Sequence, residues 1–327
     1  MEPVRWGMIG CGDVTEKKSA PSFNKINGSS LHGVTSRNKS RASAYAERHH
    51  VPKVYDSADE LVGDPEISAV YIATPPSSHA AYAIMAMRAG KPVYVEKPMA
   101  PDYQGCLEMN QMSSETDMPI FVAYYRRSME YFLKVKELLQ NQAIGKVLMV
   151  QSSLILPPRE EDRDRQNLPW RVAPEISGGG YFYDMGCHEL DILSYYFGPV
   201  RSVEGWHANM GGLYPAEDTV TASLVFESGL LYAGSWCFVA SQDAAADTIE
   251  IIGEKGRIRF SCFQFTPIEL LTENGKQEFP IAPPEHVQMP MIRSVVEELQ
   301  GLGKSPSKGD SGAHVNWIMD KTLGKLK

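Results

Sequence analysis

The sequence lacks the features that mark membrane, secreted or metal-cluster proteins. Its five cysteines are odd in number and widely spaced, and they include no Cys-x-x-Cys pair. This pattern indicates neither a disulfide framework nor a zinc cluster. No apolar run approaches the roughly 18 residues that a membrane-spanning helix needs, and the start "MEPVRWGMIG" has no basic segment followed by a long apolar core. We therefore expect a cytoplasmic protein with reduced thiols, no membrane partner and no bound metal.

Basic residues are outnumbered by acidic ones. The chain has 32 Lys and Arg against 40 Asp and Glu, which gives a net charge of −8. A broad nucleic-acid or anionic-membrane surface requires clustered Lys and Arg, so this balance argues against both partners. A local basic pocket for one phosphate remains open. At 327 residues the chain is long enough for two ordinary domains.

Short β-rich runs alternate with helical stretches in the first third of the chain. The runs are "VRWGMIG", "SLHGVTS", "ISAVYIAT", "KPVYVE" and "PIFVAY". Such alternation predicts parallel strands with helices on both faces of a sheet. Runs such as "AVYIA" carry no polar residue, as expected for strands buried on both sides. The predicted first domain is of the α/β class and covers residues 1–122.

The pattern changes beyond Tyr124. An amphipathic helix, "SMEYFLKVKELLQ", leads into a strand and then into a loop rich in proline and charge that runs to about Gly180. Strands joined by glycine-containing turns follow, and "MPMIRSVVEELQGLG" and "SGAHVNWIMDKTLGKLK" are typical of two closing helices. We predict a second domain, 123–327, of α+β type with a mostly antiparallel sheet.

A glycine-rich turn follows the first predicted strand. In "GMIGCGDVT", Gly10, Gly12 and Thr15 occupy the positions of a G-x-G-x-x-G/A fingerprint, although Thr15 departs from the usual small residue. Glycines there let the backbone approach a dinucleotide pyrophosphate, whereas the alternative is an ordinary tight turn. Pro21 indicates that the regular helix begins only near residues 19–21. The residues expected to contact the pyrophosphate are Gly10, Gly12, Asp13 and Val14.

The second predicted strand ends near residue 36, where dinucleotide-binding proteins often hold the adenosine ribose with an acidic residue. This chain reads "TSRNKSR" instead. Ser36 and Arg37 remove a carboxylate that would repel a 2′-phosphate and supply a guanidinium that can bind one. The sequence therefore favours NADP over NAD. Alternatively, Arg37 and Lys39 only solvate the start of a helix.

The stretch "PVYVEKPMA" ends a predicted strand with charged residues. Ligands of an open α/β sheet bind outside the carboxyl ends of its strands, so Lys97 should lie where the nicotinamide binds. Pro98 restricts the backbone of Lys97 and hence the direction of its ammonium group. That group could polarise a reacting oxygen or exchange a proton with it. As an alternative, Glu96 and Lys97 form a surface pair before a turn.

A second group of candidate residues lies in "SGGGYFYDMGCHELDILSYYFG". Asp184 and His188 are four residues apart and would share one helix face. His188 is then the natural general acid/base, with Asp184 orienting it or binding substrate. The competing interpretation is an N-cap aspartate with a buried core histidine.

Together, "GCGDV", "ATPPSSH", "EKPMA", "YRR" and "GGGYFYDMGCHELDIL" resemble the glucose-fructose oxidoreductase and inositol dehydrogenase (Gfo/Idh/MocA) family. The likeness covers nearly the whole chain. It implies an N-terminal Rossmann dinucleotide-binding domain and a C-terminal domain with an open antiparallel sheet. It also implies NAD(P)-dependent hydride transfer at a carbinol or carbonyl carbon, often of a sugar or polyol.

The resemblance also implies roles for individual positions. Lys97, Asp184 and His188 match the family's catalytic residues. The matching cofactor positions outside the glycine turn are Thr74, Pro75, His79, Glu96 and Pro98. Tyr125 and Arg126 match residues that enter the second domain, and Trp170 and Arg171 match a segment that often lines the substrate pocket. For Trp170 and Arg171 a loop anchor is an equal alternative.

Two other functions remain open from sequence. Relatives of the same fold include glycosidases that use a tightly held NAD as an internal redox relay, and non-catalytic NADP-binding regulators. Both the lysine and the histidine are present here, which favours an enzyme. Because an open antiparallel sheet needs its exposed face covered, we also expect a homodimer or homotetramer.

Overall fold

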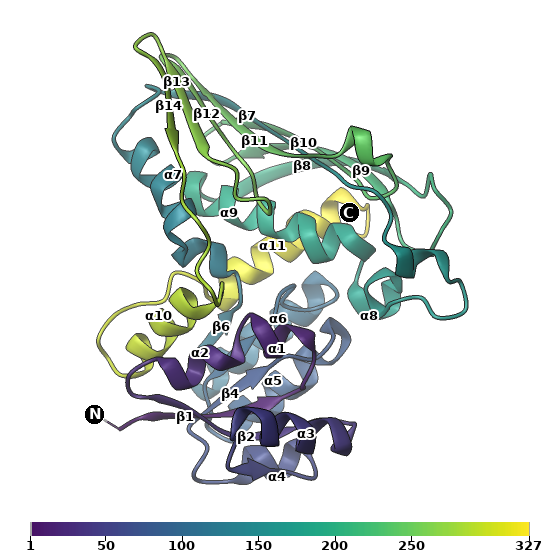
Figure 1. The fold of residues 1–327 in the computed structure, drawn as a ribbon, viewed down its shortest axis with the longest axis vertical. Coiled ribbons are helices and arrows are strands. Elements are labelled where there is room, and N and C mark those ends of the chain that lie inside the picture. Colours follow the sequence, from purple (N-terminus) through teal and green to yellow (C-terminus); the bar gives the residue numbers. More distant parts are fainter. Residues whose placement is uncertain (1, 327) are drawn as a thin grey trace. The chain divides into compact units, whose positions relative to one another are not determined.

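The computed structural model describes residues 2–326, which form two compact units (Figure 1). The first unit comprises the chain up to Met129 together with Pro284–Ala313, and the second comprises Glu130–Pro283 and the chain from His314. The predicted division at residue 122 differs, because Pro284–Ala313 returns to the first unit. There, the Gln288 amide donates to Glu96 Oε1 at 2.6 Å, and Ser307 Oγ donates to the carbonyl of Val122 at 2.8 Å.

The first unit is built on a six-stranded parallel sheet in the order β3-β2-β1-β4-β5-β6. Its central strands bury their side chains on both faces, which confirms the prediction from runs such as "AVYIA". The two-residue β3 was not predicted. The strands are β1 Val4–Ile9, β2 Ser29–Thr35, β3 Lys53–Val54, β4 Ala69–Ile72, β5 Val93–Val95 and β6 Ile120–Val122.

Helices of the first unit begin at capping residues that the sequence supplies. Asn38 Oδ1 accepts the backbone N–H of Arg41, Ser57 accepts that of Glu60, and Asp102 accepts that of Gly105. Proline stands in the first turn of α2, as expected from Pro21. The elements are α1 Asp13–Lys17, α2 Ala20–Lys25, α3 Lys39–His49, α4 Ala58–Gly63, η1 Pro76–Ser78, α5 His79–Arg88, α6 Tyr103–Thr116, η2 Tyr125–Ser128 and α10 Met289–Leu299.

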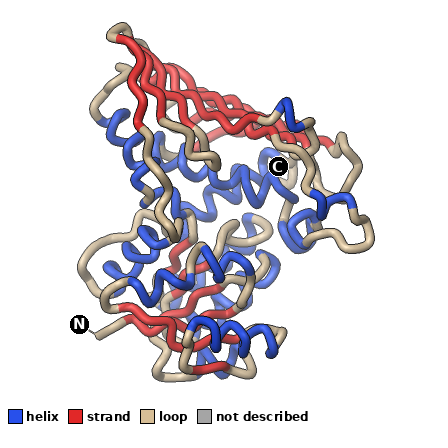
Figure 2. Tube along the Cα trace, in the orientation of Figure 1, coloured by secondary structure: helices blue, strands red, loops and turns tan. Residues whose placement is uncertain are grey.

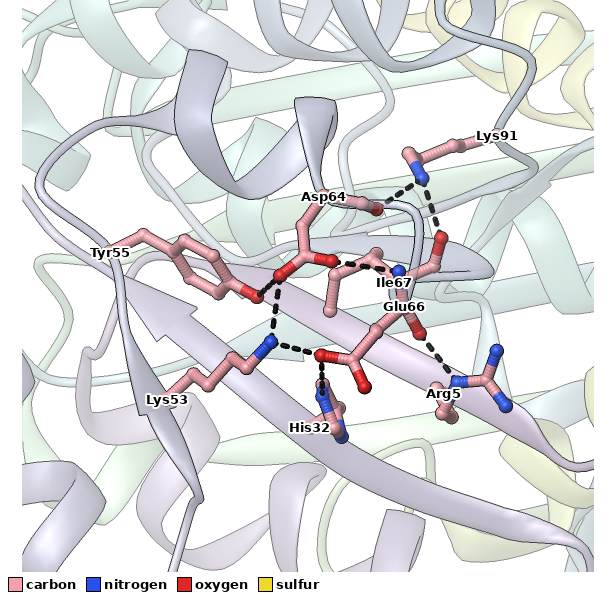
Figure 3. Close-up of polar contacts among 8 residues, drawn as sticks. All are labelled: Arg5, His32, Lys53, Tyr55, Asp64, Glu66, Ile67 and Lys91. Carbon is pink, nitrogen blue, oxygen red and sulfur yellow. Dashed lines mark hydrogen bonds and ion pairs between the residues drawn. The ribbon is translucent and has the colours of Figure 1, made fainter.

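A polar cluster joins the short strand β3 to the loop between α4 and β4 (Figure 3). Asp64 Oδ2 accepts hydrogen bonds from Tyr55 Oη at 2.6 Å and from Lys53 Nζ at 3.0 Å, and Asp64 Oδ1 accepts the backbone N–H of Glu66. Lys91 Nζ donates to the carbonyl oxygens of Asp64 and Ile67. Its loop residues precede β4 and β5, so the cluster braces the amino ends of these strands.

The second unit is built on an eight-stranded sheet in the order β14-β13-β12-β11-β7-β10-β9-β8. Only β7 and β10 pair in parallel, and the other pairs are antiparallel, as predicted. The hairpin strand β14 was not predicted. The strands are β7 Val147–Ile155, β8 Val200–Ala208, β9 Thr219–Phe226, β10 Leu231–Cys237, β11 Ala246–Gly253, β12 Gly256–Phe260, β13 Ile268–Thr272 and β14 Gly275–Phe279.

Helices of the second unit cover one face of this sheet (Figures 1 and 2). They are α7 Glu130–Gln140, α9 Cys187–Phe197 and the part of α11, Gly309–Thr322, from His314 onward. A Cβ added at Gly205 of β8 would lie 2.4 Å from the carbonyl of Thr322, so this helix lies directly on the strand. Among residues 2–326, no α-helix covers the opposite face of the sheet, and we call it the open face.

Shorter elements connect these parts: η3 Glu160–Arg163, η4 Trp170–Val172, α8 Pro174–Ser177, the π-helical turn η5 Phe182–Gly186, and η6 Gln242–Ala244. None of the helices in residues 2–326 is long and apolar enough to cross a membrane. None of the five cysteines, which all lie within these residues, forms a disulfide.

Candidate active site

The glycine turn after β1 is shaped by backbone geometry that only glycine adopts easily. Gly10 has φ +102°, and a Cβ there would lie 2.7 Å from the carbonyl oxygen of Ala73. A Cβ added at Gly12 would meet no atom within 4 Å. Thr15 is buried at the third fingerprint position, and its hydroxyl donates to the carbonyl of Gly12 at 2.7 Å. The turn therefore has the close backbone packing and open side that a pyrophosphate requires.

Helix α3 holds the short helix α1 behind this turn. Tyr45 Oη donates to the carbonyl of Thr15 at 3.1 Å. His49 Nε2 lies 2.7 Å from a carboxylate oxygen of Glu16, and Arg48 donates to the other. Although burial acts the other way, these hydrogen bonds lower the pKa of Glu16. The glycine turn is thus supported by residues that the sequence interpretation did not select.

The segment after β2 presents cationic side chains beside the glycine turn. Ser36 Oγ accepts the backbone N–H of Asn38 at 3.3 Å, Lys39 is paired with Asp56 at 2.5 Å, and the Arg37 side chain is exposed. Burial raises the pKa of the Cys11 thiol to about 12, and the positive charge of Arg41 opposes this rise. Arg41, in the first turn of α3, is a further exposed cation that was not among the predicted residues.

His79 connects the two loops that follow β4 and β5. It is fully buried, with Nε2 2.8 Å from the carbonyl oxygen of Thr74 and Nδ1 3.1 Å from that of Pro98. Burial lowers the pKa of His79. Because both ring nitrogens face backbone carbonyls, the side chain positions these loops. Pro75 caps the short helix η1 on the same loop, and the Lys97-Pro98 peptide is cis.

Glu96 is a buried carboxylate directly after β5. Its Oε1 accepts hydrogen bonds from Tyr71 Oη at 2.7 Å and from Gln288 Nε2 at 2.6 Å, and the backbone N–H of Lys97 donates to Oε2 at 3.3 Å. Only 5% of Glu96 is exposed. The surface-pair alternative is therefore wrong for Glu96. Lys97 follows at the carboxyl end of the strand, the edge at which the glycine turn also lies.

The predicted substrate residues Tyr125 and Arg126 lie in η2 of the first unit. Both are buried, and the guanidinium of Arg126 lies 5.1 Å from the centre of the Tyr125 ring.

Asp184 and His188 lie on consecutive elements of the second unit. Asp184 belongs to the π-helical turn η5, and His188 is the second residue of α9. The single predicted helix is therefore interrupted, and π-helical turns are frequent at functional sites. The imidazole of His188 is 3% exposed and packs edge-on against Phe263 at 5.9 Å.

The proline- and charge-rich loop brings Arg171 to Asp184. Arg171 Nε lies 3.2 Å from Asp184 Oδ2, and its guanidinium lies over the ring of Trp170 at 4.6 Å. Both predicted substrate residues are therefore grouped with the predicted acid. The pairing itself was not predicted, because 13 positions and an irregular loop separate the two partners.

Two buried carboxylates anchor the surrounding loops. Asp162 accepts hydrogen bonds from Tyr181 Oη at 2.6 Å and from the backbone N–H of Arg159 at 2.8 Å. Asp247 accepts the backbone N–H groups of Cys262, Phe263 and Gln264 and thereby holds the ring that contacts His188. Among residues 2–326, no group of three or more His, Cys, Asp or Glu side chains is arranged to hold a metal ion.

Comparisons with known proteins agree with this architecture. Residues 4–124 match the family model described as "Oxidoreductase family, NAD-binding Rossmann fold", and residues 132–259 match "GFO/IDH/MocA C-terminal domain". Oxidoreductase P35 of Formosa agariphila is 36% identical over 322 residues, which are 98% of each chain. The 1,5-anhydro-D-fructose reductase of Ensifer adhaerens is 24% identical, over 99% of this chain and 95% of the reductase.

A solved structure extends the comparison to the fold. Levoglucosan dehydrogenase, in complex with NADH and L-sorbose, superposes with a TM-score of 0.86 at 20% identity, over 99% of this chain and 98% of the dehydrogenase. The two family models, the relatives that match over nearly the whole chain and the two observed sheets all indicate the same family. The chain belongs to the Gfo/Idh/MocA family of oxidoreductases and carries its NAD-binding Rossmann domain.

Proposed function

We propose that this oxidoreductase transfers a hydride between a nicotinamide cofactor and a hydroxyl-bearing or carbonyl carbon of a sugar or polyol, with NADP preferred over NAD. The observation that carries the proposal is the arrangement at the carboxyl edge of the first sheet. Lys97 follows the buried Glu96 at the same edge as the glycine turn. Relatives named 1,5-anhydro-D-fructose reductase and trans-1,2-dihydrobenzene-1,2-diol dehydrogenase support chemistry at a carbon bearing oxygen.

Several residues of the first unit fit the cofactor. The backbone of Gly10–Val14 would bind the pyrophosphate, and Arg37 would bind the 2′-phosphate. Thr74 and Pro75 would lie beside the part of the cofactor that links adenosine to nicotinamide. When bound, the nicotinamide would supply or accept the hydride. His79 links the loops that carry Thr74 and Pro98 to each other through its two ring nitrogens.

Three side chains would act on the substrate. We assign to Lys97 and His188 contact with the reacting oxygen, where one of them exchanges the proton while hydride moves to or from carbon. Asp184 would orient His188 or bind a neighbouring hydroxyl, and the ion pair with Arg171 would fix the direction of the Asp184 carboxylate. Burial of His188 excludes water from its imidazole.

The proposal is tested by a screen of sugars, polyols and cyclic diols for a change in NADPH absorbance, repeated with NADH. With a substrate in hand, Lys97→Ala should lower kcat about 100-fold or more, the usual range for a group that transfers protons. NADPH affinity should stay nearly unchanged. Lys146→Ala, at an exposed position of the second unit, is the control. Near wild-type activity of Lys97→Ala would refute the role of Lys97, and a uniformly negative screen would favour a cofactor-binding regulator.

We further propose that the open face of the second sheet joins a second copy of the chain. The face exposes Trp206, Leu231 and Met149, with 67%, 56% and 38% of each residue accessible. Between them lie short hydroxyl side chains, of which Ser153 and Ser235 are hydrogen bonded at 3.2 Å. A flat surface of small polar and apolar side chains is suited to sheet-on-sheet contact.

A further inference from the structure

A buried polar chain runs across the first unit beneath the edge that carries Lys97. Tyr71 Oη lies 2.7 Å from Glu96 Oε1 and 2.8 Å from Ser19 Oγ, which in turn lies 3.3 Å from the carbonyl oxygen of Val14. Gln288 donates to the same Glu96 oxygen, and it accepts the Tyr94 hydroxyl at 3.0 Å. All of these side chains belong to the first unit. This series of hydrogen bonds connects the glycine turn to Glu96, the residue before Lys97.

Gln288 is the member that comes from furthest away in sequence. Its backbone N–H donates to the carbonyl of Lys18 at 3.2 Å, and its side chain, fully buried, reaches Glu96. Two residues earlier, His286 Nδ1 lies 3.0 Å from the carbonyl of Lys17. The segment before α10 is therefore fixed to the end of α1 by its backbone and to the end of β5 by one amide.

The chemistry of Gln288 suits this position better than that of an apolar residue. A carboxylate this deeply buried requires hydrogen-bond donors, and Glu96 Oε1 receives one from Tyr71 and one from Gln288. Burial and the nearby Glu96 charge raise the pKa of both Tyr71 and Tyr94, so both hydroxyls remain protonated donors. Loss of the amide would leave Glu96 with one strong side-chain donor, and the carboxylate would reorient.

We propose that Gln288 is a positioning residue, which holds Glu96 and thereby fixes the backbone of Lys97 and the direction of its ammonium group. The link is short, because the Lys97 N–H itself donates to Glu96 Oε2. This inference rests on the proposed function for the importance of Lys97, but the placement of Lys97 can be measured without any substrate.

The test compares the rate at which an amine-acylating reagent modifies Lys97 with the rate at exposed Lys146, by peptide mass spectrometry. In Gln288→Met, which keeps the length and removes the amide, the normalised Lys97 rate should rise about threefold to tenfold, the range for one lost hydrogen bond. Gln300→Met is the matched control, because Gln300 lies at the other end of α10 and donates to the carbonyl of Gly28. It should leave the rate unchanged. Equal rates in wild type and Gln288→Met would overturn the inference.

Gln288→Glu gives a second signature that a packing role would not produce. At about pH 6 the new carboxyl can share a proton with Glu96 and replace the amide donor, whereas at about pH 8.5 two adjacent carboxylates repel. Tyr71, Tyr94 and His79 are titratable groups that face Glu96, and Lys97 is the residue that follows it. The ratio of the Lys97 rate to the Lys146 rate should approach the wild-type ratio at the lower pH and depart from it at the higher pH, where the second carboxylate is ionised. A ratio independent of pH would contradict the proposal.

A measurement of cofactor affinity distinguishes a failure of this inference from a failure of the proposed function. Gln288→Met retains the backbone N–H that reaches Lys18, so its Kd for NADPH, measured by nicotinamide fluorescence, should stay within about twofold of wild type. A large loss of affinity with an unchanged Lys97 rate would make Gln288 a cofactor-site residue instead. If Gln288→Met does not fold, Tyr94→Phe removes the hydroxyl that orients the amide, and it should raise the Lys97 rate by a smaller factor.

Discussion

At the scale of single residues, the proposed preference for NADP depends on Arg37. It is exposed just after β2, and its neighbour Lys39 is occupied by Asp56. A guanidinium free to form charge-assisted hydrogen bonds is suited to a 2′-phosphate. Arg41, in the first turn of α3, is a second exposed cation on the same segment.

Arg37→Ala should therefore raise the Kd for NADPH about tenfold or more, the cost of losing a hydrogen bond to a charged group. The Kd for NADH should change little, because NADH lacks the 2′-phosphate. Both constants can be measured by titrating cofactor fluorescence. Lys39→Ala is the control and should affect neither cofactor, since that ammonium is already paired. An equal loss of affinity for the two cofactors would mean that Arg37 does not bind the 2′-phosphate.

Single residues also show which parts of the site could be predicted from the sequence. Gly10, Gly12, Lys97 and His188 could be selected because each carries chemistry inside a short motif. Gln288 could not be, because its partner Glu96 is 192 positions away and a glutamine in "EHVQMP" carries no local signal. Arg171 and Asp184 were each predicted as site residues, but their ion pair was not, because it depends on the conformation of the loop between them.

At the scale of elements, the predicted strands and helices agree with the structure wherever periodicity was strong. The two missed strands have clear physical reasons. Strand β3 has two residues, and β14 reads "GKQEF", an exposed hairpin strand without an apolar face. The π-helical turn at Asp184 was read as part of one helix, because residue spacing alone does not distinguish a π turn from an α turn.

The polar cluster around Asp64 is an element-scale feature, since it holds β3 against the loop before β4. The Tyr55 hydroxyl, the Glu66 N–H and the Lys53 ammonium lower the pKa of Asp64 below its usual range. A carboxylate with a lowered pKa contributes stability that is complete above its unfolded pKa of about 3.9, and this contribution is lost as pH falls through the folded pKa.

Asp64→Asn should consequently lower the Tm at neutral pH, and the difference from wild type should shrink as pH falls below about 4, where the carboxylate begins to bind a proton in the unfolded chain while it stays ionised in the folded protein. Thermal unfolding followed by circular dichroism across this range measures the effect. Asp59→Asn, one turn earlier on the exposed side of α4, is the comparison and should show a much smaller difference. A Tm gap that stays constant with pH would show that the charge of Asp64 does not matter.

At the scale of the whole molecule, the open face of the second sheet determines the expected assembly. If it joins two copies, an acidic side chain on this face should separate them, because burying an unpaired charge is costly. Leu231 lies on β10, between β7 and β9, and is 56% exposed.

Leu231→Glu should reduce the molar mass measured by light scattering after size exclusion towards that of one chain, whereas the wild type should elute as a dimer or larger. Leu302→Glu is the matched control, since Leu302 is 61% exposed in the first unit. Its molar mass should equal that of the wild type. A wild-type mass of one chain would contradict the proposed assembly outright.

The return of Pro284–Ala313 to the first unit has a consequence for how the protein is made. On the ribosome, all eight strands of the second sheet are synthesised before Gln288 emerges. Until then Glu96 is without its amide donor, and Val122 lacks the hydroxyl of Ser307. The cofactor domain is therefore completed only after the whole second sheet has been synthesised. A nascent or truncated chain that ends before residue 284 contains every glycine of the fingerprint. It lacks the segment whose side chains bind Glu96 and Val122.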